Sequence, residues 1–83
     1  MNFQRREESL ELGGQTVTLR ELSAGEFEAV MSLPEDEQGY ALVFTSLVDQ
    51  PESPQAIRDW PNTIVNTISE AVMALNGFTD QGN

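Results

Sequence analysis

The sequence contains neither cysteine nor histidine, and these two absences narrow the chemistry that the chain can perform. Without cysteine there are no disulfide bonds and no thiolate ligands for a metal ion. Without histidine the chain lacks the side chain that most often serves as a general base and as a metal ligand. We therefore expect no catalytic residues, no metal site and no cofactor, and a protein that is not an enzyme.

Basic residues are scarce: lysine is missing, and four arginines stand against 14 acidic residues, for a net charge of -10. Nucleic-acid binding needs basic side chains that displace counterions from phosphates, so no nucleic-acid partner is expected. The same charge repels anionic membrane surfaces. A well-solvated surface is one interpretation of this charge. A basic protein partner, or a partner kept in solution by a charged coat, is the other.

Long apolar runs are also missing from the sequence. No segment approaches the roughly 20 apolar residues of a membrane-spanning helix. The first residues, MNFQRREES, lack the apolar core of a signal peptide. We therefore expect a soluble protein, not a membrane protein, that stays in the cytoplasm where it is made.

The length of 83 residues suits one small domain, 1–83, with a single core. Residues 1–7 are polar and are expected to form a loose N-terminal arm. In residues 8–20 apolar positions alternate on both sides of Gly13-Gly14, which predicts a β-hairpin with one apolar face. That face is expected to carry Leu10, Leu12, Val17 and Leu19. Because a lone hairpin is not stable, this face must pack on helices.

Residues 23–78 show helical patterns, and we expect them to form a compact core of three to four short helices. Ser23 and Glu26 have the spacing of a capping box, which predicts the start of the first helix. Pro34 ends that helix or restarts the chain in a new direction. The fold class is therefore α+β and mainly helical, with the N-terminal hairpin packed on the helices.

The second helical pattern follows Pro34 and has one apolar stripe. The stripe, expected to face the core, consists of Tyr40, Val43, Phe44, Leu47 and Val48. At ~100° per residue Leu42 projects roughly 160° away from Tyr40, so it is expected on the opposite face. Gly39 is a mild flaw in this helix, because a helical glycine costs about 1 kcal/mol relative to alanine.

The last part of the chain contains a proline-rich connection and the longest helical pattern. Ser53-Pro54 has the form of an N-cap followed by proline, which predicts a single turn over 55–60. The last helix is expected to begin at Pro61 or Asn62 and to end at Asn76-Gly77. Its apolar stripe consists of Ile64, Val65, Ile68, Ala71, Val72 and Leu75. Phe78 is expected to fold back on the last turn, and residues 79–83 to form a disordered tail.

Acidic residues give little indication of catalysis or of metal binding. The run at 35–37 lacks the alternating carboxylates and the glycine of a calcium loop, and acids at a helix start explain it better. Glu26 and Glu28 are two places apart on a helix, so their carboxylates point in different directions. The serines have no histidine or lysine to activate them as nucleophiles.

Three apolar residues are candidates for partner binding: Leu42, Met73 and Trp60. Leu42 and Met73 lie opposite the apolar stripes of their helices, and the flexible thioether of methionine suits adaptable binding. The plainer interpretation is that these residues are ordinary exposed apolar side chains or are covered by further structure. For Trp60 the plainer interpretation is a core residue, and partner contact is the alternative.

The order of these features is similar to that of the small tail assembly chaperones of long-tailed bacteriophages. Those acidic proteins often have a strand of the form "G…VTLREL" leading to "S…E", then a helix with an aliphatic face. A loop with Asp, Pro and Glu follows, and "WP" or "LP" opens a final helix that ends in "LNG". The matching segments here are GGQTVTLRELSAGEF, ALVFTSLVDQPES and DWPNTIVNTISEAVMALNGF, and the resemblance extends from about Leu12 to Phe78.

The resemblance implies a function without bond chemistry. Such chaperones bind the long apolar helices of the tape-measure protein while tail-tube subunits polymerise around it. The expected partners are the tape-measure protein and the tail-tube protein, and the expected location is the host cytoplasm, not the mature virion. The family supplies no catalytic residue. An acidic coat is consistent with keeping such a complex soluble.

Two other functions remain open from the sequence. A small acidic inhibitor that mimics DNA would need carboxylates aligned on one surface, whereas those of this chain are spread over the hairpin, the helix starts and the loops. An oligomeric structural module, in which the chain associates with copies of itself, would need no other partner.

Overall fold

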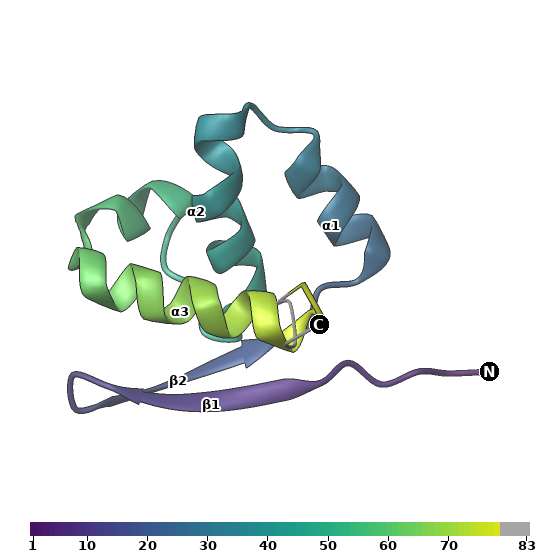
Figure 1. Ribbon diagram of the computed structural model, residues 1–83, viewed down its shortest axis with the longest axis horizontal. Helices are drawn as coiled ribbons and strands as arrows, with labels where there is room; N and C mark the ends of the chain where they lie inside the picture. The colour runs from purple at the N-terminus through teal and green to yellow at the C-terminus, as the bar shows by residue number, and fades with distance from the viewer. Residues whose placement is uncertain (79–83) are drawn as a thin grey trace.

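The chain folds as an N-terminal β-hairpin followed by helices in the computed structural model, which describes residues 1–78 (Figure 1). The strands β1 (Glu7–Leu12) and β2 (Gln15–Arg20) pair antiparallel. The helices that follow are α1 (Ala24–Met31), α2 (Glu35–Ser46), the 3₁₀-helix η1 (Pro54–Asp59) and α3 (Asn62–Leu75). This architecture confirms the predicted α+β, mainly helical class. The tail predicted to be disordered, 79–83, lies outside the described residues.

The hairpin turn consists of Gly13 and Gly14, whose φ angles are 56° and 79°. A two-residue turn of type I′ needs positive φ at both positions, and glycine adopts it without a steric penalty. The turn fixes a register in which Leu10 lies opposite Val17. These two side chains and Leu12 pack against the core on the predicted apolar face, and Leu19 on the same face is fully buried.

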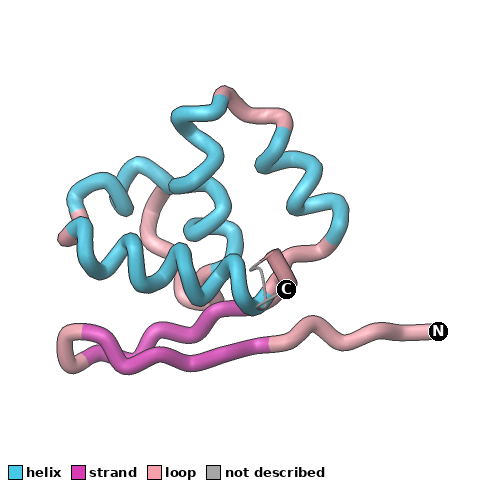
Figure 2. The backbone as a smooth tube through the Cα atoms, viewed as in Figure 1, coloured by secondary structure: helices cyan, strands magenta, loops and turns pink. Residues whose placement is uncertain are grey.

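Helix α3 lies between the hairpin and α2, and it contacts both (Figures 1 and 2). Helices α1 and η1 pack on α2. The centre of the core is formed by fully buried side chains from four of these elements: Leu19, Val43, Ile57, Ile68 and Val72. All six residues of the stripe predicted for α3 belong to the core or pack against it. That part of the sequence interpretation is confirmed.

The stripe predicted for α2 is wrong at two positions. Leu42 was expected on the face away from the core but is only 9% exposed, and Val48 was expected in the core but is 52% exposed. Leu42 is buried because α2 has α1, η1 and α3 packed around it, so more than one of its faces is covered. Val48 lies beyond the end of the helix, and its N–H donates to the Thr18 carbonyl of β2 at 3.0 Å. Helical spacing no longer applies there.

The predicted capping box at the start of α1 is confirmed. The Glu26 N–H donates to Ser23 Oγ at 3.1 Å, and the Ser23 N–H donates to Glu26 Oε1 at 2.9 Å. The predicted turn after Ser53 is also present, as η1, with Pro54 as its first residue. The Ser53 side chain, however, makes no capping hydrogen bond.

The N-terminal residues before β1 are tied to the helices by two arginines. Arg5 forms an ion pair with Glu26, with 3.0 Å between Nη1 and Oε1. The Arg6 guanidinium donates to the Leu75 carbonyl at the end of α3. Its backbone N–H donates to the Glu21 carboxylate at 3.0 Å. The arm expected to be loose over 1–7 is therefore held at Arg5 and Arg6, and β1 begins at Glu7.

Candidate partner-binding grooves

An apolar groove of about 330 Å³ opens between α1 and the C-terminal end of α3, with α2 beneath it. We call it the α1–α3 groove. Its lining comes from all three helices and the residue after α3, and consists of Phe27, Met31, Glu35, Gln38, Gly39, Leu42, Met73 and Phe78. Figure 1 shows α1 and α3 on different sides of α2, as this arrangement requires.

The wall of the groove at the end of α3 is set by how that helix ends. Gly77 has a φ of 77°, the left-handed conformation that glycine adopts easily. The Phe78 N–H then donates to the Met73 carbonyl at 2.8 Å, and the Gly77 N–H donates to the Ala74 carbonyl at 3.1 Å. These two bonds form a Schellman motif. The motif directs Phe78 back toward α1, where its ring lies 5.0 Å from that of Phe27.

The end of α3 is also fixed to the connection between β2 and α1. The Asn76 side-chain oxygen accepts the Leu22 N–H at 2.9 Å, and its amide nitrogen donates to the Val72 carbonyl at 2.8 Å. Both bonds are partly buried; the first gives the Leu22 N–H a partner, and the second adds to the backbone bond that the Asn76 N–H donates to the same Val72 carbonyl at 3.1 Å. The walls of the α1–α3 groove are therefore held by hydrogen bonds as well as by apolar contact.

Two of the three residues predicted for partner binding meet in this groove. Met73 stands at its edge and is 36% exposed, while Leu42 is buried and forms part of its floor. Met31 and Phe78, at 41% and 43% exposed, add two more large apolar side chains at the surface. The groove thus presents flexible and aromatic side chains that no described residue covers. Such a surface can bind apolar side chains of a partner.

The charge in the lining of the α1–α3 groove is negative. Among residues 1–78, Glu35 is the one ionisable residue in its lining, and none of the four arginines lines it. Arg5 and Arg6 are engaged with α1 and α3 as described above, and the Arg58 guanidinium lies 4.5 Å from the centre of the Tyr40 ring. An occupant of the groove therefore meets the Glu35 carboxylate in the lining itself.

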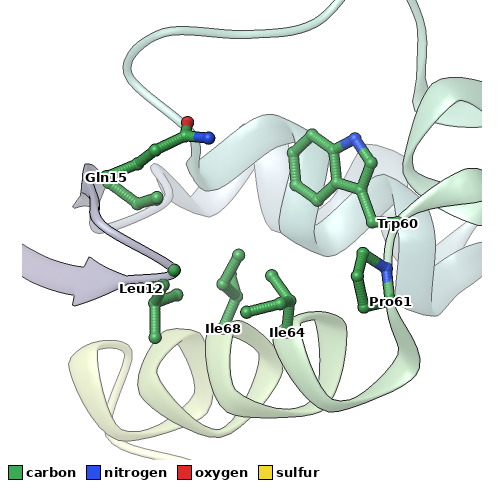
Figure 3. A pocket seen from close by; sticks show the side chains of 8 residues that line it. Leu12, Gln15, Trp60, Pro61, Ile64 and Ile68 are labelled. Atoms are coloured by element: carbon green, nitrogen blue, oxygen red, sulfur yellow. The ribbon is translucent and has the colours of Figure 1, made fainter.

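Trp60, the third predicted residue, lies in a different groove near the other end of α3. This Trp60 groove has a volume of about 350 Å³ and separates the hairpin turn from the start of α3 (Figure 3). Its lining consists of Leu12, Gly13, Gln15, Val17, Trp60, Pro61, Ile64 and Ile68. No residue is shared with the α1–α3 groove. Trp60 is half-buried and packs against the core, so it belongs to the joint between hairpin and helix.

Groups able to perform bond chemistry are few in the described part of the chain. Residues 1–78 contain no cluster of three or more side chains placed to hold a metal ion. The pKa of Glu26 is lowered mainly by the hydrogen bond from the Ser23 backbone and further by the charge of Arg5. Ser46 is fully buried and its hydroxyl has no hydrogen-bond partner, but it lies inside the core and not in a groove.

Sequence analysis missed four residues of the α1–α3 groove that matter to its shape: Phe27, Met31, Gly39 and Phe78. Phe27 and Met31 share one face of α1 with Val30, but only Val30 is fully part of the buried core. The signal that separates them from true core residues is that the helix has only eight residues and ends just before Pro34, so α2 covers only part of its apolar face. Gly39 was noted only as a flaw.

Comparison with known proteins gave no match: no protein-family model, no curated protein and no solved structure is similar to this chain. Within the residues that the structure describes, no helix has the length and apolar character needed to cross a bilayer.

Proposed function

We propose that the protein is a non-enzymatic assembly chaperone that binds an apolar helical segment of a partner and keeps it in solution. In the setting that the sequence resemblance implies, the partner is a phage tape-measure protein. It is held in the host cytoplasm while tail-tube protein polymerises around it, and the chaperone is absent from the mature virion. The observation that carries the proposal is the α1–α3 groove, with Met31, Met73 and Phe78 exposed at its surface.

A helix is the occupant that suits the shape of this groove. An amphipathic helix inserts apolar side chains, spaced one turn apart, into a hollow between other helices. Here α1 and α3 form the two walls and α2 forms the floor. Methionine side chains at the edges have several rotatable bonds, so they can adjust to different apolar anchors along a long partner.

The charge of the chain supports the same function. A net charge of -10 keeps a complex soluble when an apolar partner segment is covered. It also speeds the encounter with a partner that carries basic residues. The carboxylates remain outside the apolar lining, apart from Glu35, so binding does not require a buried, unpaired charge.

The test is to co-express the chain with the proteins encoded by its genomic neighbours and to measure capture and solubility; the proposal expects a long helical tape-measure protein to be captured. Met73→Glu places a charge in the groove, and we expect it to abolish capture while the protein remains folded. Ala74→Glu is the matched control, because Ala74 is exposed next to Met73 and does not line the groove. Both changes put an acid in the last turn of α3, so their unfavourable interaction with the helix dipole is similar.

The results separate the proposal from its alternatives. Loss of capture by Met73→Glu but not by Ala74→Glu supports the groove as the binding site. Equal capture by both variants means that Met73 is an ordinary exposed residue. Recovery of a nuclease or repressor that DNA displaces favours the DNA mimic, and self-association with no other partner favours a structural module.

A further inference from the structure

Gly39 is a helical glycine that the fold itself does not require. It lies inside α2, one turn before Val43 in the core. Its φ is not among the positive values found at Gly13, Gly14 and Gly77. A Cβ atom built on it would meet no other atom within 4 Å. Neither backbone conformation nor packing therefore explains a residue that weakens the helix relative to alanine.

The position of Gly39 supplies the explanation. It lines the floor of the α1–α3 groove beside Leu42, one turn along the same helix. Because the space above it is empty, any side chain at this position enters the groove volume. We infer that Gly39 is a specificity-determining residue: it leaves room for one bulky apolar side chain of a partner helix that carries basic residues beside its apolar face. This inference rests on the proposed function and specifies its partner.

The chemistry of the partner follows from the lining and the charge. The walls carry four apolar side chains, so the partner side chain that sits above Gly39 is expected to be apolar. These wall residues are Phe27, Met31, Met73 and Phe78. The rim carries Glu35, and Asp36 and Glu37 follow in the first turn of α2, so basic residues flanking the anchor gain favourable interactions. A second copy of this chain is a poor occupant, because two molecules of charge -10 repel each other.

The experiment measures binding of a fluorescently labelled amphipathic peptide, with leucines at i, i+4 and i+7 and lysines at positions that flank this apolar face. Gly39→Leu is expected to lower its affinity on the order of tenfold or more, because the new side chain occupies the place of the central leucine. Gly39→Ala is expected to raise the melting temperature by about 4 to 8 °C and to weaken binding by a smaller factor. A more stable variant that binds less well cannot owe its loss to unfolding.

Gly25→Leu is the matched control. Gly25 is an exposed helical glycine of α1, a Cβ atom built on it would meet nothing within 4 Å, and it does not line the groove. We expect this variant to bind the peptide like the unmodified protein. A second peptide, with the central leucine replaced by alanine, should lose less affinity for Gly39→Leu than for the unmodified protein. This size exchange, in which a smaller peptide residue compensates for a larger residue at position 39, shows that the central peptide residue and residue 39 are energetically coupled.

The outcomes distinguish this inference from the proposed function. If the unmodified protein binds neither peptide, helix capture by the groove fails and the role of Gly39 fails with it. If it binds the leucine peptide but Gly39→Leu binds equally well, only the role of Gly39 is overturned. A change in self-association without a change in peptide affinity also overturns it. Loss confined to the Gly39 variants, together with the size exchange, supports it.

Discussion

Helix α3 contributes to two apolar grooves of similar volume, and the two differ in what their side chains do. At its N-terminal half, Ile64 and Ile68 line the Trp60 groove, but both also belong to the core or pack against it. At its C-terminal end, Met73 and the following Phe78 line the α1–α3 groove and stand at the surface. The first groove is a joint between packed elements, while the second is a surface without a described partner. A hollow alone therefore does not identify a binding site.

The largest expected effect tests this contrast along a single helix. Ile68→Ala removes a fully buried side chain beneath the Trp60 groove and is expected to lower the free energy of unfolding by about 2 to 5 kcal/mol. Met73→Ala is expected to cost less than about 1 kcal/mol, because the side chain is already partly solvated. Urea unfolding followed by circular dichroism measures both. Equal costs at the two positions would remove the distinction between joint and surface.

A smaller effect of opposite sign is expected at the core end of α2. Ser46 is fully buried with an unpaired hydroxyl, and Leu47 beside it bridges to Leu19 of β2. Ser46→Ala removes the unpaired group and improves helix propensity, so it should raise the free energy of unfolding by about 0.5 to 1.5 kcal/mol. Thermal unfolding measures the gain.

Ser46→Ala also sharpens the comparison with Gly39→Ala at the other end of the same helix. Both changes are expected to stabilise α2, but only the change at Gly39 enters the α1–α3 groove. Peptide affinity should therefore fall for Gly39→Ala and stay constant for Ser46→Ala. If both variants lose affinity, rigidity of α2 and not the free space over Gly39 controls binding.

The fold was predictable from the sequence wherever a local pattern determines structure. The Gly13-Gly14 turn, the capping box of Ser23 and the stripe of α3 each depend on residues close together in the chain, and each is confirmed. The stripe of α2 failed because helical periodicity describes one apolar face. Leu42 is buried by α1 and α3, which approach α2 from positions that the spacing within α2 does not contain.

The candidate site was predictable only in part for the same reason. Leu42 and Met73 were selected as residues on the wrong face of separate helices, and the structure brings them into one groove. Phe78 completes that groove, because the Schellman motif turns it toward α1 and its ring contacts Phe27. Phe27 and Phe78 are 51 positions apart in the sequence, so local patterns cannot predict this contact. Gly39 was visible as a helix-weakening residue, but its meaning depends on the empty space above it.

The smallest expected effect is a pH dependence of folding stability that comes from Glu26 in α1, next to the α1–α3 groove. The Ser23 backbone hydrogen bond, and then the charge of Arg5, lower the pKa of Glu26 below its usual 4.5. A carboxyl whose pKa is lower in the folded state stabilises the fold above its unfolded pKa. That contribution is lost as pH falls from about 4.5 through the folded value. The effect is modest, because the ion pair with Arg5 is about a third exposed and is screened by solvent.

Glu26→Gln isolates this contribution, because glutamine retains the capping bond but carries no charge. Between about pH 6 and about pH 3 the unmodified protein should lose more thermal stability than the variant. Since Glu26 precedes Phe27, amide hydrogen exchange at low pH should increase first in α1, at the α1–α3 groove, and later around Ile68 in the core. Parallel pH profiles for both proteins would show that the capping box contributes through hydrogen bonding alone. In that case the acid sensitivity of the groove end must come from its other carboxylates.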